Sequence, residues 1–126
     1  MQKRFEVPVL LIFFCRDEVL RQVFDCVKKV KPTRLYLYQD GPRNELDMPG
    51  ILACRDIVSK VDWDCEVHTF YQEKNVGCDP SEYIAQKWMF ESEERGIVLE
   101  DDDVVSNSLA ASLSESPASK ALANLP

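Results

Sequence analysis

The sequence predicts an α/β domain with a mainly parallel sheet, built in the order β-α-β-α-β-α-β. Four short apolar runs rich in aliphatic and aromatic residues recur along residues 7–99. Segments with apolar residues at helical spacing separate these runs, and the links between them are short. Strands that alternate with helices in this way form parallel sheets with right-handed crossovers.

The first strand and helix are predicted from residues 7–31. Residues 7–15 are almost continuously apolar, which is typical of a strand buried on both faces of a parallel sheet. Asp17 and Glu18 suit the start of a helix, and Pro32 ends it. Apolar residues follow the helical period at Val19, Leu20, Val23, Phe24, Val27 and Val30.

The second strand and helix follow the same alternation. Residues 35–39 are predicted as a strand, closed by the turn residues 40–42, Asp-Gly-Pro. Pro49 then opens a second helix, which we expect to extend to Val61.

The third and fourth strands enclose one further helix. Residues 65–71 alternate well enough to predict the third strand. Asp79, followed by Pro80 and by Glu82, predicts a helix whose N-cap is Asp79 and which continues to Glu94. Gly96 separates this helix from a fourth strand at residues 97–99.

Composition limits the class of protein. The chain has 126 residues, of which 45% are hydrophobic and 29% charged, which is typical of one soluble domain. We expect the domain to cover residues 1–105 and residues 106–126, rich in Ser and Ala, to form a poorly ordered tail. The formal net charge of −7 argues against nucleic acid or an anionic membrane as a partner.

Cellular location is predicted from the cysteines and the N-terminus. The five cysteines are odd in number and form no Cys-x-x-Cys pair, which favours buried thiols in a reducing compartment. The apolar run at residues 7–15 is too short for a membrane span and contains Pro8, which disfavours a signal peptide. We therefore expect a cytoplasmic protein without a membrane span.

The acidic run at residues 100–103, Glu-Asp-Asp-Asp, is the strongest functional signal. It follows the fourth predicted strand directly, and four adjacent carboxylates repel one another unless a cation lies among them. Hard divalent ions such as Mg²⁺ and Mn²⁺ prefer oxygen ligands of this kind. The alternative is a solvated acidic loop or a cap on a following helix.

Polar residues follow the other strands as well, and together they predict a nucleotide-type site. Arg16 follows the first strand, Asp40 the second, and Asn75 and Gly77 the third. Ligands of open α/β sheets bind outside the carboxyl ends of the strands, where these residues would meet. Arg16 could instead pair with nearby acids, Asp40 could hold its own turn, and Asn75-x-Gly77 could be a simple turn. The glycine-rich dinucleotide and phosphate-loop motifs are missing from the sequence.

Four segments in order resemble the N-terminal half of a GT-A-type glycosyltransferase: residues 8–16, 38–43, 74–78 and 96–102. The similarity is to bacterial nucleotide-diphospho-sugar transferases that share a sheet pattern with N-acetylglucosaminyltransferase I. It implies a GT-A or Rossmann-like fold that binds a nucleotide sugar, and a UDP-sugar in particular. It also implies Mn²⁺ or Mg²⁺ as the cofactor that bridges the diphosphate.

The resemblance also implies roles for individual residues. Asp102 would be the direct metal ligand and Asp101 would face the ribose or the sugar. Asp40 would contact the uracil, and Arg16 would lie near the nucleotide. The register of the acidic motif stays open because Asp-x-Asp is also present, so the candidate ligands are Glu100, Asp102 and Asp103.

The chain departs from this family after the acidic motif. Such enzymes continue into an acceptor-binding half that supplies the catalytic base, whereas here the tail at residues 106–126 follows. We therefore expect a truncated or frame-shifted product that binds the donor and is inactive alone. The alternative is that the remainder lies on another chain, and the acceptor and the catalytic residues are unknown.

Two other functions are compatible with the same residues. A Mg²⁺-dependent phosphohydrolase of the haloacid dehalogenase type would use Asp101 as nucleophile and Asp103 as acid or base, although its motif belongs after a first strand. A nucleotide- or metal-binding remnant without catalysis is the third possibility.

Overall fold

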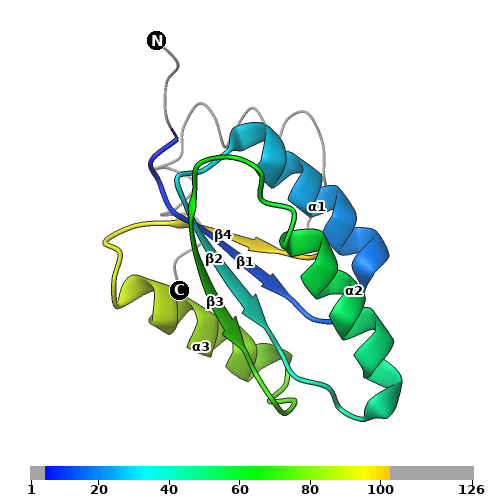
Figure 1. Cartoon of the computed structure of the whole chain (residues 1–126). Coiled ribbons are helices and arrows are strands. Elements are labelled where there is room, and N and C mark those ends of the chain that lie inside the picture. The colour runs from blue at the N-terminus through cyan, green and yellow to red at the C-terminus, as the bar shows by residue number, and fades with distance from the viewer. Residues whose placement is uncertain (1–4, 103–126) are drawn as a thin grey trace.

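A computed structural model describes residues 5–102 of the chain (Figure 1). The elements are β1 (Val9–Phe13), α1 (Asp17–Val30), β2 (Arg34–Gln39), the short 3₁₀ helix η1 (Glu45–Asp47), α2 (Met48–Val58), β3 (Glu66–Tyr71), α3 (Cys78–Phe90) and β4 (Ile97–Glu100). The predicted alternation of strands and helices is confirmed. Asp103 and the predicted tail lie outside the described residues. No helix within residues 5–102 is long and apolar enough to cross a membrane.

The sheet is wholly parallel, with the strand order β3-β2-β1-β4. The chain therefore moves outward from β1 to β3 and then returns through α3 to place β4 on the other side of β1. In register, Val9 of β1 lies between Leu35 of β2 and Ile97 of β4. This is an α/β arrangement of the Rossmann-like kind, and the order of the strands reverses between β1 and β4.

Two apolar layers cover the two faces of the sheet. On one face, Leu11 of β1 and Leu37 of β2 pack with Leu20 of α1 and Cys54 of α2. On the other face, the alternate strand residues pack against α3 (Figure 1) in a cluster of Leu10, Ile12, Tyr36, Tyr38, Val98, Ala85 and Met89. Because both faces are covered, β1 is buried along its whole length, as its continuous apolar run predicted.

The start of α3 differs from its prediction. The helix begins at Cys78, its N-cap is Gly77, and Asp79 lies inside the first turn. Gly77 has a φ of 97°, a conformation that glycine adopts without strain, and this turns the chain into the helix one residue before Asp79. The prediction of Asp79 as the N-cap is therefore wrong.

Three other predicted boundaries are too long. α3 ends at Phe90 and not at Glu94, and α2 ends at Val58 and not at Val61. β1 covers five residues because its pairing with β2 and β4 begins at Val9 and ends at Phe13.

The five cysteines are free thiols, and the sequence favoured buried ones. Cys26 and Cys54 are buried, as predicted. Cys15 and Cys65 are half-buried and Cys78 is exposed at the start of α3, so the prediction is wrong for these three.

We predict that Gly50→Ala destabilises the protein although alanine favours helices. Alanine would contribute about 1 kcal/mol through helix propensity. Its Cβ, however, would overlap the backbone carbonyl oxygen of Cys15 and approach the Cys15 Cβ to 3.1 Å. Such overpacking costs about 1–3 kcal/mol, and backbone cannot rotate away as a side chain can. Urea unfolding should therefore give a lower free energy of unfolding for Gly50→Ala.

The control for this prediction is Leu52→Ala, in the same helix. Leu52 is 55% exposed, so its truncation should change the free energy of unfolding by less than about 0.5 kcal/mol. A Gly50→Ala protein as stable as the wild type would contradict the close contact between α2 and the residues after β1.

Candidate functional site

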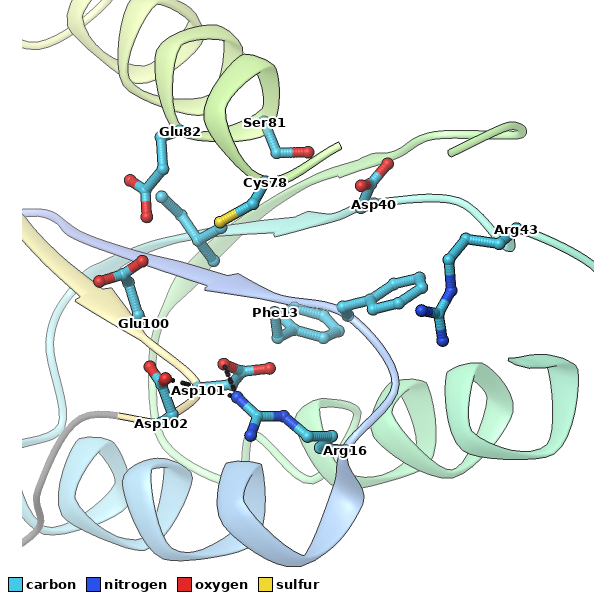
Figure 2. Close-up of a pocket in the computed structure, with 12 residues that line it drawn as sticks. Phe13, Arg16, Asp40, Arg43, Cys78, Ser81, Glu82, Glu100, Asp101 and Asp102 are labelled. Carbon is cyan, nitrogen blue, oxygen red and sulfur yellow. Dashed lines mark ion pairs between the residues drawn. The ribbon is translucent and has the colours of Figure 1, made fainter. Parts of the chain in front are cut away.

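A pocket of about 320 Å³ lies outside the carboxyl ends of β1 and β4 (Figure 2). It is therefore at the position where the strand order reverses, which is the usual ligand site of open α/β sheets. Its walls come from β1, β4, the start of α3 and the residues that follow β1, β2 and β4. The lining residues are Ile12, Phe13, Phe14, Arg16, Asp40, Arg43, Cys78, Ser81, Glu82, Glu100, Asp101 and Asp102.

Asp101 and Asp102 form one side of the pocket together with Arg16. The backbone N–H of Asp101 donates to the carbonyl oxygen of Ile12 at 3.0 Å, which extends the pairing of β1 with β4 past the end of the strand. The Arg16 Nη2 lies 3.6 Å from the Asp101 Oδ1 and 3.4 Å from the Asp102 Oδ2. The Asp101 side chain is only 12% exposed, whereas that of Asp102 is 56% exposed.

Burial and Arg16 have opposite effects on Asp101. Burial is the main cause that raises the pKa of Asp101, and the nearby Arg16 guanidinium lowers it. Arg16 therefore stabilises the charged form of a carboxylate that its surroundings disfavour. The alternative that Arg16 pairs with nearby acids holds in the structure, and those acids are Asp101 and Asp102.

Glu100 and Glu82 face each other across the pocket, Glu100 at the end of β4 and Glu82 in α3 (Figure 2). A side-chain hydrogen bond with Glu82, followed by burial, raises the pKa of Glu100 to about 7. The second carboxyl group beside Glu100 disfavours its charged form. Sequence reasoning assigned Glu82 to the capping of α3, so its place in the pocket was missed.

The acidic side offers the oxygen atoms that a divalent cation prefers. Glu82, Glu100 and Asp102 all line the pocket, and the contact with Glu82 together with burial raises the pKa of Glu100. Within residues 5–102, no three His, Cys, Asp or Glu side chains are already arranged as a metal site. The residue types therefore fit a hard cation, and the side chains would have to turn toward it.

Asp40 organises the opposite wall through four hydrogen bonds. Its Oδ1 accepts from the N–H groups of Gly41 at 2.8 Å and Val76 at 2.9 Å. Its Oδ2 accepts from the Asn75 Nδ2 at 3.0 Å and the Gly77 N–H at 3.1 Å. The carboxylate thereby uses all its acceptor positions, and it fixes the residues that lead into α3. Asn75 and Gly77 are partners of Asp40 and are not lining residues.

Arg43 and Phe14 form the other end of the pocket, which the sequence analysis did not identify. The Arg43 Nε and Nη2 donate to the two carboxylate oxygens of the buried Asp47 at 3.0 and 2.9 Å. This contact lowers the pKa of Asp47. The guanidinium carbon lies 5.3 Å from the centre of the Phe14 ring. The only sequence signal for this fork was the i,i+4 spacing of the two charges.

The hydroxyl and thiol groups in the pocket are not activated nucleophiles. Burial and the nearby acids raise the pKa of the Cys78 thiol above its ordinary value of 9, so it stays protonated at neutral pH. The buried Ser81 Oγ forms a hydrogen bond with the Tyr38 hydroxyl at 3.0 Å. His68, the sole histidine, lies in β3 and stacks on Tyr36, with ring centres 4.6 Å apart.

We predict that Asp40→Asn destabilises the loop before α3. The Asn side chain would place an NH₂ group, which cannot accept a hydrogen bond, opposite the backbone N–H of Val76 or Gly77. Each buried donor that loses its acceptor in this way costs about 1–3 kcal/mol. Urea unfolding should show the loss of stability, and hydrogen exchange should become faster at the amides of Val76 and Gly77. Asp79→Asn is the matched control, because Asp79 is exposed and caps no helix. Unchanged exchange at both amides would contradict this role of Asp40.

We predict that Glu100→Gln makes the protein more stable at high pH relative to the wild type. The folded state raises the pKa of Glu100 from 4.5 to about 7, so its proton-linked stabilisation is complete below pH 4.5 and is lost as the pH rises through about 7. Urea unfolding should therefore show that the free energy of unfolding of the variant, relative to that of the wild type, rises between about pH 5 and about pH 8. The rise should be modest because Glu100 is only half-buried.

The control for this pH dependence is Glu94→Gln, an exposed acid beyond the end of α3. It carries the same change of charge, so its difference from the wild type should stay nearly constant with pH. An equal pH dependence in both variants would show that net charge, and not the Glu82–Glu100 contact, is responsible.

No protein-family model, curated protein or solved structure matches this chain. The fold and the pocket described above therefore rest on the chain's own residues. The resemblance to GT-A glycosyltransferases rests on the four sequence segments that carry it and stays a prediction.

Proposed function

We propose that the chain binds a nucleotide diphosphate sugar, and a UDP-sugar in particular, together with Mn²⁺ or Mg²⁺, as the donor-binding part of a glycosyltransferase. The observation that carries this proposal is the meeting of Arg16 with Glu100, Asp101 and Asp102 in one pocket at the switch point of the sheet. A cationic side chain beside a group of carboxylates is complementary to a ligand that combines a divalent cation with a diphosphate.

Electrostatics supports the need for a cation. The chain has a formal net charge of −7, and four acids besides Asp40 line the pocket. A bare diphosphate would be repelled by these carboxylates, and a divalent cation between them removes the repulsion. The raised pKa of Glu100 is consistent with a position where a cation would be favoured.

Different residues of the pocket would contact the cation and the phosphates of the ligand. Asp102 is exposed and would hold the cation with Glu100, with Asp103 as a further candidate beyond the described residues. Asp101 is buried and would position Arg16, which would contact the phosphates. The bound cation would act as a Lewis acid for the charge on the departing diphosphate.

The base would lie toward the other end of the pocket. There the Phe14 ring and the Arg43 guanidinium offer a stacking surface to a planar ring. Asp40 lines the same pocket, but its four hydrogen bonds occupy its acceptors, so we assign it the support of this wall and not a direct contact with uracil.

The phosphohydrolase alternative has less support. Its nucleophile, Asp101, is largely buried, and it follows β4 at the edge of the sheet. A remnant that binds the nucleotide without transferring sugar would use the same residues as the proposal. No residue is assigned as the catalytic base or to the acceptor.

We predict that UDP binding requires a divalent cation and is lost in Asp102→Ala. Titration calorimetry with UDP should give binding in Mn²⁺ and none in chelator, and removal of a direct ligand should weaken the affinity at least about tenfold. Asp56→Ala is the matched control, because Asp56 is an exposed acid on α2 that pairs only loosely with Lys60 at 3.8 Å. UDP binding that is independent of the metal, or unchanged in Asp102→Ala, would contradict the proposal.

A further inference from the structure

Arg16 places one nitrogen between two carboxylates. The same Nη2 atom lies 3.4 Å from the Asp102 Oδ2 and 3.6 Å from the Asp101 Oδ1 (Figure 2). Arg16 is the N-cap residue of α1, and its side chain makes no capping hydrogen bond. Its guanidinium therefore serves as a positive charge on the acidic side of the pocket.

Arg16 is surrounded by an excess of acidic residues in the pocket. Five acids line it, and the only cations among its lining residues are Arg16 and Arg43. The Arg43 guanidinium is already bound to Asp47 in a fork, through hydrogen bonds of 3.0 Å from Nε and 2.9 Å from Nη2. Arg16 is thus the one lining cation left for the acids.

The contacts of Arg16 are loose where those of Arg43 are tight. At 3.4 and 3.6 Å they are ion pairs without hydrogen-bond geometry, and the side chains of Arg16 and Asp102 are 53% and 56% exposed. Ion pairs of this kind contribute little to stability, so the guanidinium can leave Asp102 at low cost. Asp101, in contrast, is held by its backbone hydrogen bond to Ile12 and stays in place.

We propose that Arg16 makes this site selective for a cation–diphosphate complex over the bare cation. Without ligand, Arg16 neutralises Asp101 and Asp102 and so competes with a cation for the same carboxylates. A bare cation has to displace this guanidinium and leave it beside a second positive charge. A cation that arrives with a diphosphate supplies phosphate oxygens, and Arg16 moves from its carboxylates to those oxygens.

The inference rests on the proposed function and adds an energetic coupling to it. Because the coupling between cation and diphosphate is reciprocal, each ligand strengthens the binding of the other through Arg16. Loss of the Arg16 charge must then have opposite effects on the two kinds of ligand. It removes a competitor for the bare cation, and it removes a partner of the diphosphate.

We predict these opposite effects for Arg16→Gln. Calorimetry with MnCl₂ alone should show binding about 5-fold or more tighter than in the wild type, and titration with UDP in saturating MnCl₂ should show binding about 5-fold or more weaker. Arg21→Gln is the matched control, because Arg21 lies on the same helix and pairs with Asp17 at 3.5 Å outside the pocket. It removes the same charge and should leave both affinities unchanged.

A second variant keeps the test decisive if Arg16→Gln does not fold. Arg16→Lys retains the positive charge, so its affinity for bare Mn²⁺ should stay close to that of the wild type. Tighter binding of bare Mn²⁺ by Arg16→Lys would overturn the inference.

The remaining outcomes separate the inference from the function on which it rests. If Mn²⁺ and UDP bind together to the wild type but bare Mn²⁺ binds Arg16→Gln no more tightly, the inference alone is overturned. Equal changes in Arg21→Gln also overturn it, because net charge would then explain the result. If the wild type binds neither Mn²⁺ nor UDP, the proposed function and the inference both fail.

Discussion

The pairing of β4 with β1 is the interaction on which the candidate site depends. β1 forms parallel ladders with β2 on one side and β4 on the other, and the Asp101 N–H continues the second ladder by donating to Ile12. This places the acidic residues after β4 beside Arg16, which follows β1. A shift of one residue in this register would exchange the faces of Glu100 and Asp101, and the ion pairs with Arg16 would be lost.

Asp40 provides the second constraint, because it connects the end of β2 to the start of α3. Its four hydrogen bonds fix the residues around Gly77, and α3 begins at the next residue. Glu82, one turn into α3, is thereby set opposite Glu100. A buried carboxylate that looks like a ligand contact in the sequence therefore acts through the helix that it positions.

The sequence predicted the features that depend on local patterns. The alternation of elements and the gathering of Arg16 and Asp101 at one edge follow from apolar periodicity and from the shared direction of parallel strands. Glu82 was missed because its role arises from a contact that no local pattern encodes, and Asp47 was missed because i,i+4 charge spacing is too common to identify a buried ion pair. The start of α3 was misplaced because an N-cap motif at Asp79 competed with the backbone conformation of Gly77, which only the fold determines.

The two arginines of the pocket differ in how firmly they are held, so one end of the pocket is preformed and the other can rearrange. Arg43 is held by Asp47 against Phe14, so that end of the pocket is already formed before a ligand arrives. A preformed end loses little side-chain freedom on binding. Arg16 is held only by loose ion pairs, so the acidic end can rearrange. A ligand that carries a planar ring and a diphosphate with its cation would contact both ends of the pocket. A bare cation would contact only the acidic end, where Arg16 competes with it for the carboxylates.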